Sequence, residues 1–498
     1  MPHRLSAFSN VGLDEALLNL VLDEHRATAI PRLEKLWTYF RNPLTPAGRA
    51  STRGWYRQGQ EVGLPPRVLG DPALALDDRA VLRREVVIEN DIAWRVQAMV
   101  DFIFGKPVTI ISTAKDPSKR RLIERLLDRV WEQSGGISLL QDMALLAHVF
   151  GHVDLAVRAR PRHAAPVDPA DERALDALRP ILDDIRIDAI DPRRGIPITS
   201  PRDYRDLSAY LISVEHATNT VESNSNSPLS IIRRAWQSPA VRKRSATLEV
   251  LSAQRRQLYE DDRLVIDEDL AWTQGRIPVV HIQNIAQPFH YSGLSDVEPL
   301  IPLQDELNTR LSDRACRVTM QSFKMYLAKG LEGFDTAPVA TGQLWTTDNM
   351  DAHISEFGGD ASCPSEEAHI EGVREALDKV SGIPPLAGGV VRAKVGNLSS
   401  ANALRITLMG VLAKTERKRV TYGRGMAQVC SLILAALDHA GALPTTEEER
   451  AVRLEWNDPL PEDITREVQA AQGKVELGVP RERVLAELGY APGDPGIG

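Results

Sequence analysis

Residues 293–329 form the stretch that most constrains the fold, because they read as one long amphipathic helix. Its leucines recur at spacings of three and four residues, which places them on one helix face. These are Leu300, Leu303, Leu307 and Leu311, and Ala315 and Val318 continue the stripe. About 30 residues at roughly 1.5 Å per residue give a rod of about 45 Å. That is long for a helix of a globular domain.

A second face of the same stretch is basic. Its cations follow at spacings of four, three and seven residues: Arg310, Arg314, Arg317 and Lys324. These cations could form ion pairs with acids of a neighbouring helix or subunit, or they could lie against a phosphate backbone. Acids stand among the arginines, and tight binding to phosphates needs several uncompensated cations. The pattern therefore argues against a tight grip on nucleic acid.

Composition limits the classes of protein that remain. The chain has 498 residues, of which 43% are hydrophobic and 26% charged, so it is long enough for two to four folding units. Its net charge of -8 argues against a protein that grips nucleic acid over its whole surface. Three widely spaced cysteines, Cys316, Cys363 and Cys430, predict buried thiols in a reducing compartment. We expect no signal peptide and no membrane span, and hence a soluble intracellular protein.

The periodicities predict an α+β chain that is mainly helical. Pro31 is expected to split the first helical region into two helices, and 41–76 to form an extended arm. Short alternating runs between about 186 and 283 predict an antiparallel sheet region. Further helices are expected at 91–104, 119–133, 137–150, 364–381, 400–440 and 463–477.

Enzymatic signatures are weak. The chain contains no phosphate-binding loop of the GxxxxGK[ST] type and no GxSxG motif. His148, His152 and Asp154 have a metal-like spacing, but Gly151 separates the histidines, which favours a structural role. Cys316 beside Arg314 is read as a buried thiol rather than a reactive one. The acidic residues of 260–269 suggest either a solvated rim or a two-metal nuclease.

The order of segments over residues 30–490 resembles that of the portal proteins of tailed double-stranded-DNA bacteriophages. The resemblance rests on LEKLWTYF, NDIAWRVQAMVDFIFGKPVTI, DMALLAHVFGHVDLAVRAR, GRIPVVHIQN with SGLSDVEPLIPLQDELNTRLSD, SGIPPLAGG with NLSSANALRITLMGVLAKTERK, and EWNDPLPED. It implies a phage portal fold with a wing, a long-helix stem, a small clip and a helical crown, assembled as a ring. The implied divisions are 1–80 (N-terminal helices and arm), 81–293 (wing), 294–322 (stem), 323–352 (clip), 353–439 (second stem, tunnel loop and long wing helix) and 440–498 (crown).

The resemblance also implies a function without catalysis or cofactor. A dodecameric ring at the capsid vertex of the virion would form the channel for genome packaging and ejection. It would be assembled in the host cytoplasm, with no membrane involved. Its expected partners are the terminase large subunit, a head-completion adaptor, the major capsid or scaffolding protein, and double-stranded DNA that passes without sequence recognition. The alternatives are a metal-dependent phage nuclease or processing enzyme that uses 260–269, and a helical adaptor without DNA contact.

Candidate site residues follow from this assignment. The stem would bury Leu303, Leu307 and Leu311 against neighbouring copies, and a tunnel loop would lie near 354–364. The residues expected to line the DNA channel are Arg310, Arg314, Arg317, Lys324, Glu356 and Asp360. Whether the arginine face lines the channel or forms ion pairs between subunits stays open at this point.

Overall fold

The structure is a computed structural model. It describes residues 3, 5–46, 56–69, 85–200, 202–203, 206–218, 243–261, 263–322, 325–329, 350–357, 363–389, 401–460, 464–481 and 483–484. The chain divides into two compact units. The first unit consists of Met1–Ile30, Gln97–Ser295 and Pro384–Gly498, and the second of Pro31–Val96 and Asp296–Ile383. The divisions implied by the resemblance stay predictions.

The first unit contains most of the strands. A five-stranded antiparallel sheet has the order β10-β9-β8-β7-β6, and a three-stranded sheet has the order β11-β4-β5. Their strands are β4 (His152–Arg158), β5 (Arg186–Ile190), β6 (Gly195–Thr199), β7 (Leu207–Thr218), β8 (Lys243–Leu251), β9 (Arg255–Glu260), β10 (Arg263–Asp269) and β11 (Val279–Gln283). β14 (Val452–Glu455) pairs with β3 (Thr109–Ser112). The predicted antiparallel region is confirmed.

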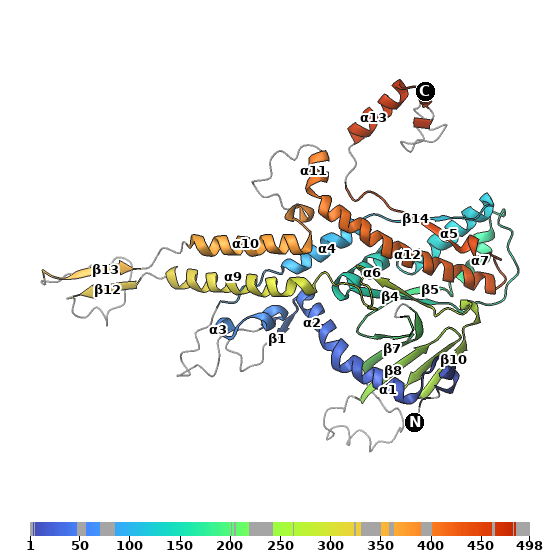
Figure 1. Cartoon of the computed structure of the whole chain (residues 1–498), viewed down its shortest axis with the longest axis horizontal. Coiled ribbons are helices and arrows are strands. Elements are labelled where there is room, and N and C mark those ends of the chain that lie inside the picture. Colours follow the sequence, from blue (N-terminus) through green and yellow to red (C-terminus); the bar gives the residue numbers. More distant parts are fainter. Residues whose placement is uncertain are drawn as a thin grey trace, which may run out of the picture. The chain divides into compact units, whose positions relative to one another are not determined.

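Helices cover these sheets (Figure 1). In the first unit, α5 (Pro117–Gln133), α6 (Ile137–Phe150) and α12 (Met409–His439) pack against these strands. The unit also contains η1 (Leu5–Val11), α1 (Glu15–Glu24), α7 (Ala174–Leu182), α11 (Ala401–Thr407) and α13 (Ile464–Glu476). Leu5, Phe8 and Leu18 of the N-terminal helices form one apolar cluster with Leu211 and Val250 of the large sheet. The N-terminus is thus fixed by burial of apolar surface against that sheet.

The C-terminal third of α12 is buried on nearly all sides, as its continuous apolar sequence from 429 to 437 requires. Burial raises the pKa of the Cys430 thiol in this stretch to about 12, whereas Cys316 and Cys363 are only partly buried. By length and composition α12 could span a membrane, contrary to the expectation from the sequence. However, 61% of its most apolar window is buried, as in the core helix of a globular domain.

The second unit contains α2 (Ile30–Arg41) from Pro31 onward, the short α3 (Pro66–Leu69), the start of α4 (Asp91–Phe104), α9 (Ile301–Ser322) and α10 (Pro364–Ser381). Its strands form two antiparallel pairs. These are β1 (Leu44–Pro46) with β2 (Tyr56–Gln58), and β12 (Met325–Lys329) with β13 (His353–Phe357).

Two predictions about helix ends are wrong. The helix expected over 293–329 runs only from Ile301 to Ser322, after a 3₁₀ turn at Glu298–Leu300. Residues 325–329 instead pair with 353–357, so a partner strand distant in the sequence decides their structure. Pro31 also fails to end a helix: α1, a π-turn at His25–Ala29 and α2 follow one another without interruption. A π-turn widens the helix directly before the proline, which lacks an N–H group.

Two backbone segments meet closely at one end of the three-stranded sheet. Gly151 ends α6 with a φ of 92°, and the Asn284 amide donates to the Gly151 carbonyl at 2.9 Å. A Cβ on Gly293 would lie 2.5 Å from the Ile285 carbonyl oxygen and 2.7 Å from that of Gly151. Both neighbours are backbone atoms and cannot rotate away, so position 293 requires glycine.

We expect Gly293→Ala to lower the free energy of unfolding by about 1–3 kcal/mol, the usual cost of overpacking. Gly372→Ala is the matched control, because no atom lies within 4 Å of its added Cβ in the middle of α10. That control should stabilise the protein by about 0.5–1 kcal/mol. Urea unfolding followed by circular dichroism measures both, and equal stability of the two variants would contradict the close approach.

Candidate functional site on the α9–α10 helix pair

α9 and α10 of the second unit lie side by side and run in opposite directions, with the β12–β13 pair beyond their ends (Figure 1). The chain leaves along α9, continues into β12, and returns through β13 into α10. Residues 330–349 of this excursion lie outside the described residues, as does most of the expected clip. β13 occupies the beginning of the expected tunnel loop, so 353–357 form a strand rather than a loop.

The apolar faces of the two helices are buried within the chain. Leu307 and Leu311 of α9 are 0% and 3% exposed, and α10 buries Ile370, Val373 and Leu377. Leu300, Leu307 and Leu311 of the predicted stripe are thus buried within the chain, whereas Val318 is 41% exposed, and packing against neighbouring copies stays a prediction. Leu307 and Leu311 have almost no surface left to bury against a second copy, which leaves Leu303, partly exposed, for the predicted contact between copies.

A buried polar row lies on another face of α9. Gln304, Asn308 and Ser312 follow at spacings of four, and each is at most 1% exposed. They form hydrogen bonds with the backbone of residues 87–92, the segment that leads into α4. Asn308 Oδ1 accepts from the Glu89 amide at 3.1 Å, and Gln304 Nε2 donates to the Glu89 carbonyl at 2.6 Å. Ser312 Oγ accepts from the Val87 amide at 3.0 Å.

Gln60 extends this polar row to the neighbouring segments. Asn308 Nδ2 donates to Gln60 Oε1 at 2.9 Å, and Gln60 Nε2 donates to the Tyr39 carbonyl at 2.6 Å. Gln60 is completely buried, so each of these bonds satisfies a group that has no access to water. Sequence reasoning missed the row, although three polar residues at spacings of four on a leucine-rich helix were a usable signal.

Arg95 connects the start of α4 to the end of α10. Its side chain is 3% exposed and donates to Asp91 at 2.9 Å and to Asp378 at 2.7 Å. The remaining nitrogen donates to the Ser381 hydroxyl and to the Ile383 carbonyl at 2.9 and 2.6 Å. A buried guanidinium with two carboxylate partners is stable only while both partners are present.

The basic face of α9 is largely paired within the chain. Arg310 donates to Glu306 at 2.7 Å, and His369 of α10 lies 3.0 Å from the same carboxylate. Burial would raise the pKa of Glu306, but the hydrogen bonds with His369 and Arg310 bring it below its ordinary value. Asp313 on the same helix pairs with Arg67 at 2.5 Å.

The other predicted channel residues differ in their surroundings. Arg317 pairs with Glu366 of α10. Arg314 forms no ion pair with any residue that the structure describes. Lys324 and Asp360 lie outside the described residues, and Glu356 lies on β13 with its side chain outside them. Arg317 thus joins α9 to α10, Arg310 is paired within α9, and Arg314 is the one of the three without an ion pair to a described residue.

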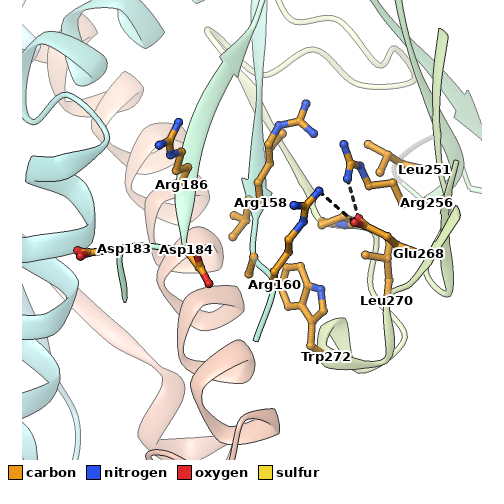
Figure 2. A pocket seen from close by; sticks show the side chains of 14 residues that line it. Arg158, Arg160, Asp183, Asp184, Arg186, Leu251, Arg256, Glu268, Leu270 and Trp272 are labelled. Carbon is orange, nitrogen blue, oxygen red and sulfur yellow. Dashed lines mark hydrogen bonds and ion pairs between the residues drawn. The ribbon is translucent and has the colours of Figure 1, made fainter. Parts of the chain in front are cut away.

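The acidic residues of 260–269 do not form a metal centre in the described part of the chain. Figure 2 shows Glu268 between Arg160 and Arg256, with ion pairs of 3.1 and 2.6 Å, at a cavity of about 320 Å³. Asp267 pairs with Arg255 at 2.7 Å. No three His, Cys, Asp or Glu side chains among the described residues are placed to hold a metal ion. Asp267 and Glu268 are therefore neutralised by arginines, which suits a solvated rim.

Asp154 has a structural role, as its surroundings in the sequence predicted. It is 1% exposed and accepts hydrogen bonds from Tyr210 at 2.6 Å and Tyr291 at 2.8 Å, with His281 Nδ1 at 2.7 Å. Burial would raise the pKa of Asp154, but the charge and hydrogen bond of His281 bring it below its ordinary value. The carboxylate joins β4 to β7 and to β11.

Comparison with known proteins identifies one family. A family model described as "Phage portal protein, SPP1 Gp6-like" matches residues 83–489. No curated protein matches the chain. The chain is also similar to a chain of the "Virion of native gene transfer agent (GTA) particle", with 12% identity and a TM-score of 0.43. It resembles a chain of the "Neck of empty GTA particle computed with C6 symmetry", with 13% identity and a TM-score of 0.45. Each match covers 80% of this chain and 90% of the other.

The polar row on α9 can be tested with Asn308→Leu. The variant leaves the Glu89 amide and Gln60 Oε1 without partners, and each stranded buried group costs about 1–3 kcal/mol. Thr319→Leu is the matched control, because Thr319 is exposed on the same helix and surface changes usually stay within about 0.5 kcal/mol. Urea unfolding measures both variants. If Asn308→Leu unfolds at the same urea concentration as the control, the row does not stabilise the unit.

Proposed function

The chain belongs to the SPP1 Gp6-like phage portal proteins, and on that premise we propose that its copies form a dodecameric ring around a central channel. The protein acts at the capsid vertex. The observation that carries this proposal is the family match over residues 83–489, which includes most of both units. Double-stranded DNA passes through the channel during genome packaging and ejection. The protein has no catalytic role of its own in this proposal, so a separate ATPase supplies the energy.

The charge distribution of α9 suits passage of DNA without capture. Affinity for DNA grows with the number of phosphates that free cations neutralise. Arg310 and Arg317 are engaged by acids of their own chain, and the whole chain carries a net charge of -8. A channel lined by such helices can guide a polyanion without holding it. We therefore assign contact with DNA first to Arg314, with Lys324, Glu356 and Asp360 as further candidates.

The partners follow from the same proposal. The terminase large subunit docks during packaging, and a head-completion adaptor docks afterwards. Both dock at the clip, residues 323–352, of which β12 is the described strand. The major capsid or scaffolding protein surrounds the ring in the virion, and assembly takes place in the host cytoplasm.

Electron microscopy of the purified chain tests the ring. We expect twelve-fold rings with a central channel in negative stain, together with a matching mass by light scattering.

The same preparation should be incubated with DNA and magnesium as a test of the alternative function, a metal-dependent nuclease. A compact monomer or dimer at all concentrations would contradict the portal proposal, and metal-dependent DNA cleavage would favour the nuclease.

Two charge reversals on α9 separate DNA contact from helix packing. Arg314→Glu should leave ring formation and the melting temperature unchanged and lower the amount of packaged DNA severalfold. Arg317→Glu is the matched control: it places a second carboxylate beside Glu366 and should lower the melting temperature. Thermal unfolding and a packaging assay measure both. Normal packaging by Arg314→Glu would exclude this residue from the channel lining.

A further inference from the structure

The strand β11 has an open edge. It pairs on one side with β4, and the Val157 amide donates to the Pro278 carbonyl while the Asn284 amide donates to the Gly151 carbonyl, both at 2.9 Å. This register directs the backbone groups of 278, 280, 282 and 284 toward β4. The N–H and C=O groups of Val279, His281 and Gln283 therefore point away from the sheet. They form no backbone hydrogen bond with any part of the chain that the structure describes.

A groove runs along this edge, within the first unit. Its volume is about 830 Å³, and β11 forms one wall. The opposite lining comes from α12, through residues such as Arg424 and Gln428, and from the start of β7. The β11 groove, as we call it, thus has the three unpaired positions in its lining, with His281 and Gln283 partly exposed and Val279 6% exposed.

β11 lacks the features that usually protect an exposed edge. Edge strands are commonly blocked by lysine, by proline or by a bulge, because unpaired backbone groups bind other strands. The sequence of β11 is Val-Val-His-Ile-Gln, and its pairing with β4 is regular over all five residues. An edge of this kind is suited to strand addition, in which an extended segment pairs with the sheet through main-chain hydrogen bonds.

Among the described residues, the groove lining has more cationic than acidic side chains, and Glu447 lies near one of the cations, Arg276. This lining contains Arg276 and Arg424 but only one acidic side chain, Asp206. Arg276 donates to the Ser431 hydroxyl at 3.3 Å, and burial together with the nearby Arg450 lowers its pKa. Arg424 forms no ion pair with a described residue. An occupant with carboxylates would therefore be attracted to the groove.

We propose that the β11 groove binds an extended acidic segment of a neighbouring copy, which adds a fourth strand beside β11. This inference rests on the proposed ring, in which each copy meets the next. Contacts in such a ring are head-to-tail, so a groove on one copy receives a different surface of the next. A second copy is also an acidic partner, since the chain carries a net charge of -8.

Val279→Pro tests the main-chain pairing directly. The Val279 amide points toward the groove, so proline removes a donor to the added strand and keeps every hydrogen bond to β4. Val279→Ala is the matched control, because it removes the same side chain and keeps the amide. We expect both variants to have similar circular dichroism and melting temperatures as monomers. Val279→Pro should lower the fraction of chains in rings severalfold relative to Val279→Ala.

The outcomes separate this inference from the ring itself. If Val279→Pro and Val279→Ala assemble equally well, the β11 edge is not an interface, and the ring proposal stands. If the unmodified chain forms no ring, the proposed function fails first. If Val279→Pro does not fold, a second measurement decides: a photo-crosslinking amino acid in place of Gln428 in the assembled full chain. It should link to an acidic segment of a neighbouring copy, and links confined to the same copy would overturn the inference.

Discussion

The second unit depends on the hydrogen bonds between the polar row of α9 and the backbone of residues 87–92. Gln304 and Asn308 hold the amide and carbonyl of Glu89 much as a neighbouring strand would. The extended segment thereby satisfies its main chain without joining a sheet. This segment places Asp91 and Arg95 at the end of α10, where the buried Arg95 guanidinium donates to Asp91 and to Asp378. The position of the helix pair is thus fixed by directional bonds as well as by its apolar faces.

The contacts of α9 also show how far its arginines are free to bind phosphates. A row of arginines in a sequence suggests a surface for phosphates, but most of these arginines have acidic partners in the same chain. Such pairs contribute little to stability at an exposed surface, usually less than about 1 kcal/mol. Their larger effect is on binding, because a paired guanidinium offers less uncompensated charge to a phosphate. If DNA passes along α9 as proposed, this pairing would leave Arg314 as an isolated contact rather than part of a clamp.

The sequence predicted those elements whose signals are local. The leucine periodicity of α9 and the apolar run of α12 both became helices, and the alternating runs around β8 became strands. The single helix expected over 400–440 is divided into α11 and α12. The errors arose where another segment decided the outcome. Tyr326 and Leu327 continue a helical stretch in the sequence, but they form the strand β12 because they pair with residues 353–357. Val318 continues the predicted apolar stripe of α9 in the sequence but is 41% exposed.

The candidate site was harder to predict because charge and polarity in a sequence do not reveal their partners. Asn308 and Arg310 are two residues apart on one helix, yet the first is buried among amides and the second pairs with Glu306 near the surface. The open edge of β11 depends on segments that lie even farther apart in the sequence. It exists because β4, which precedes β11 by more than a hundred residues, takes the centre of the sheet, so that β11 has one partner among the described strands. Strand order therefore leaves an edge that no local motif encodes, and in the proposed ring such an edge would pair with a neighbour through main-chain hydrogen bonds.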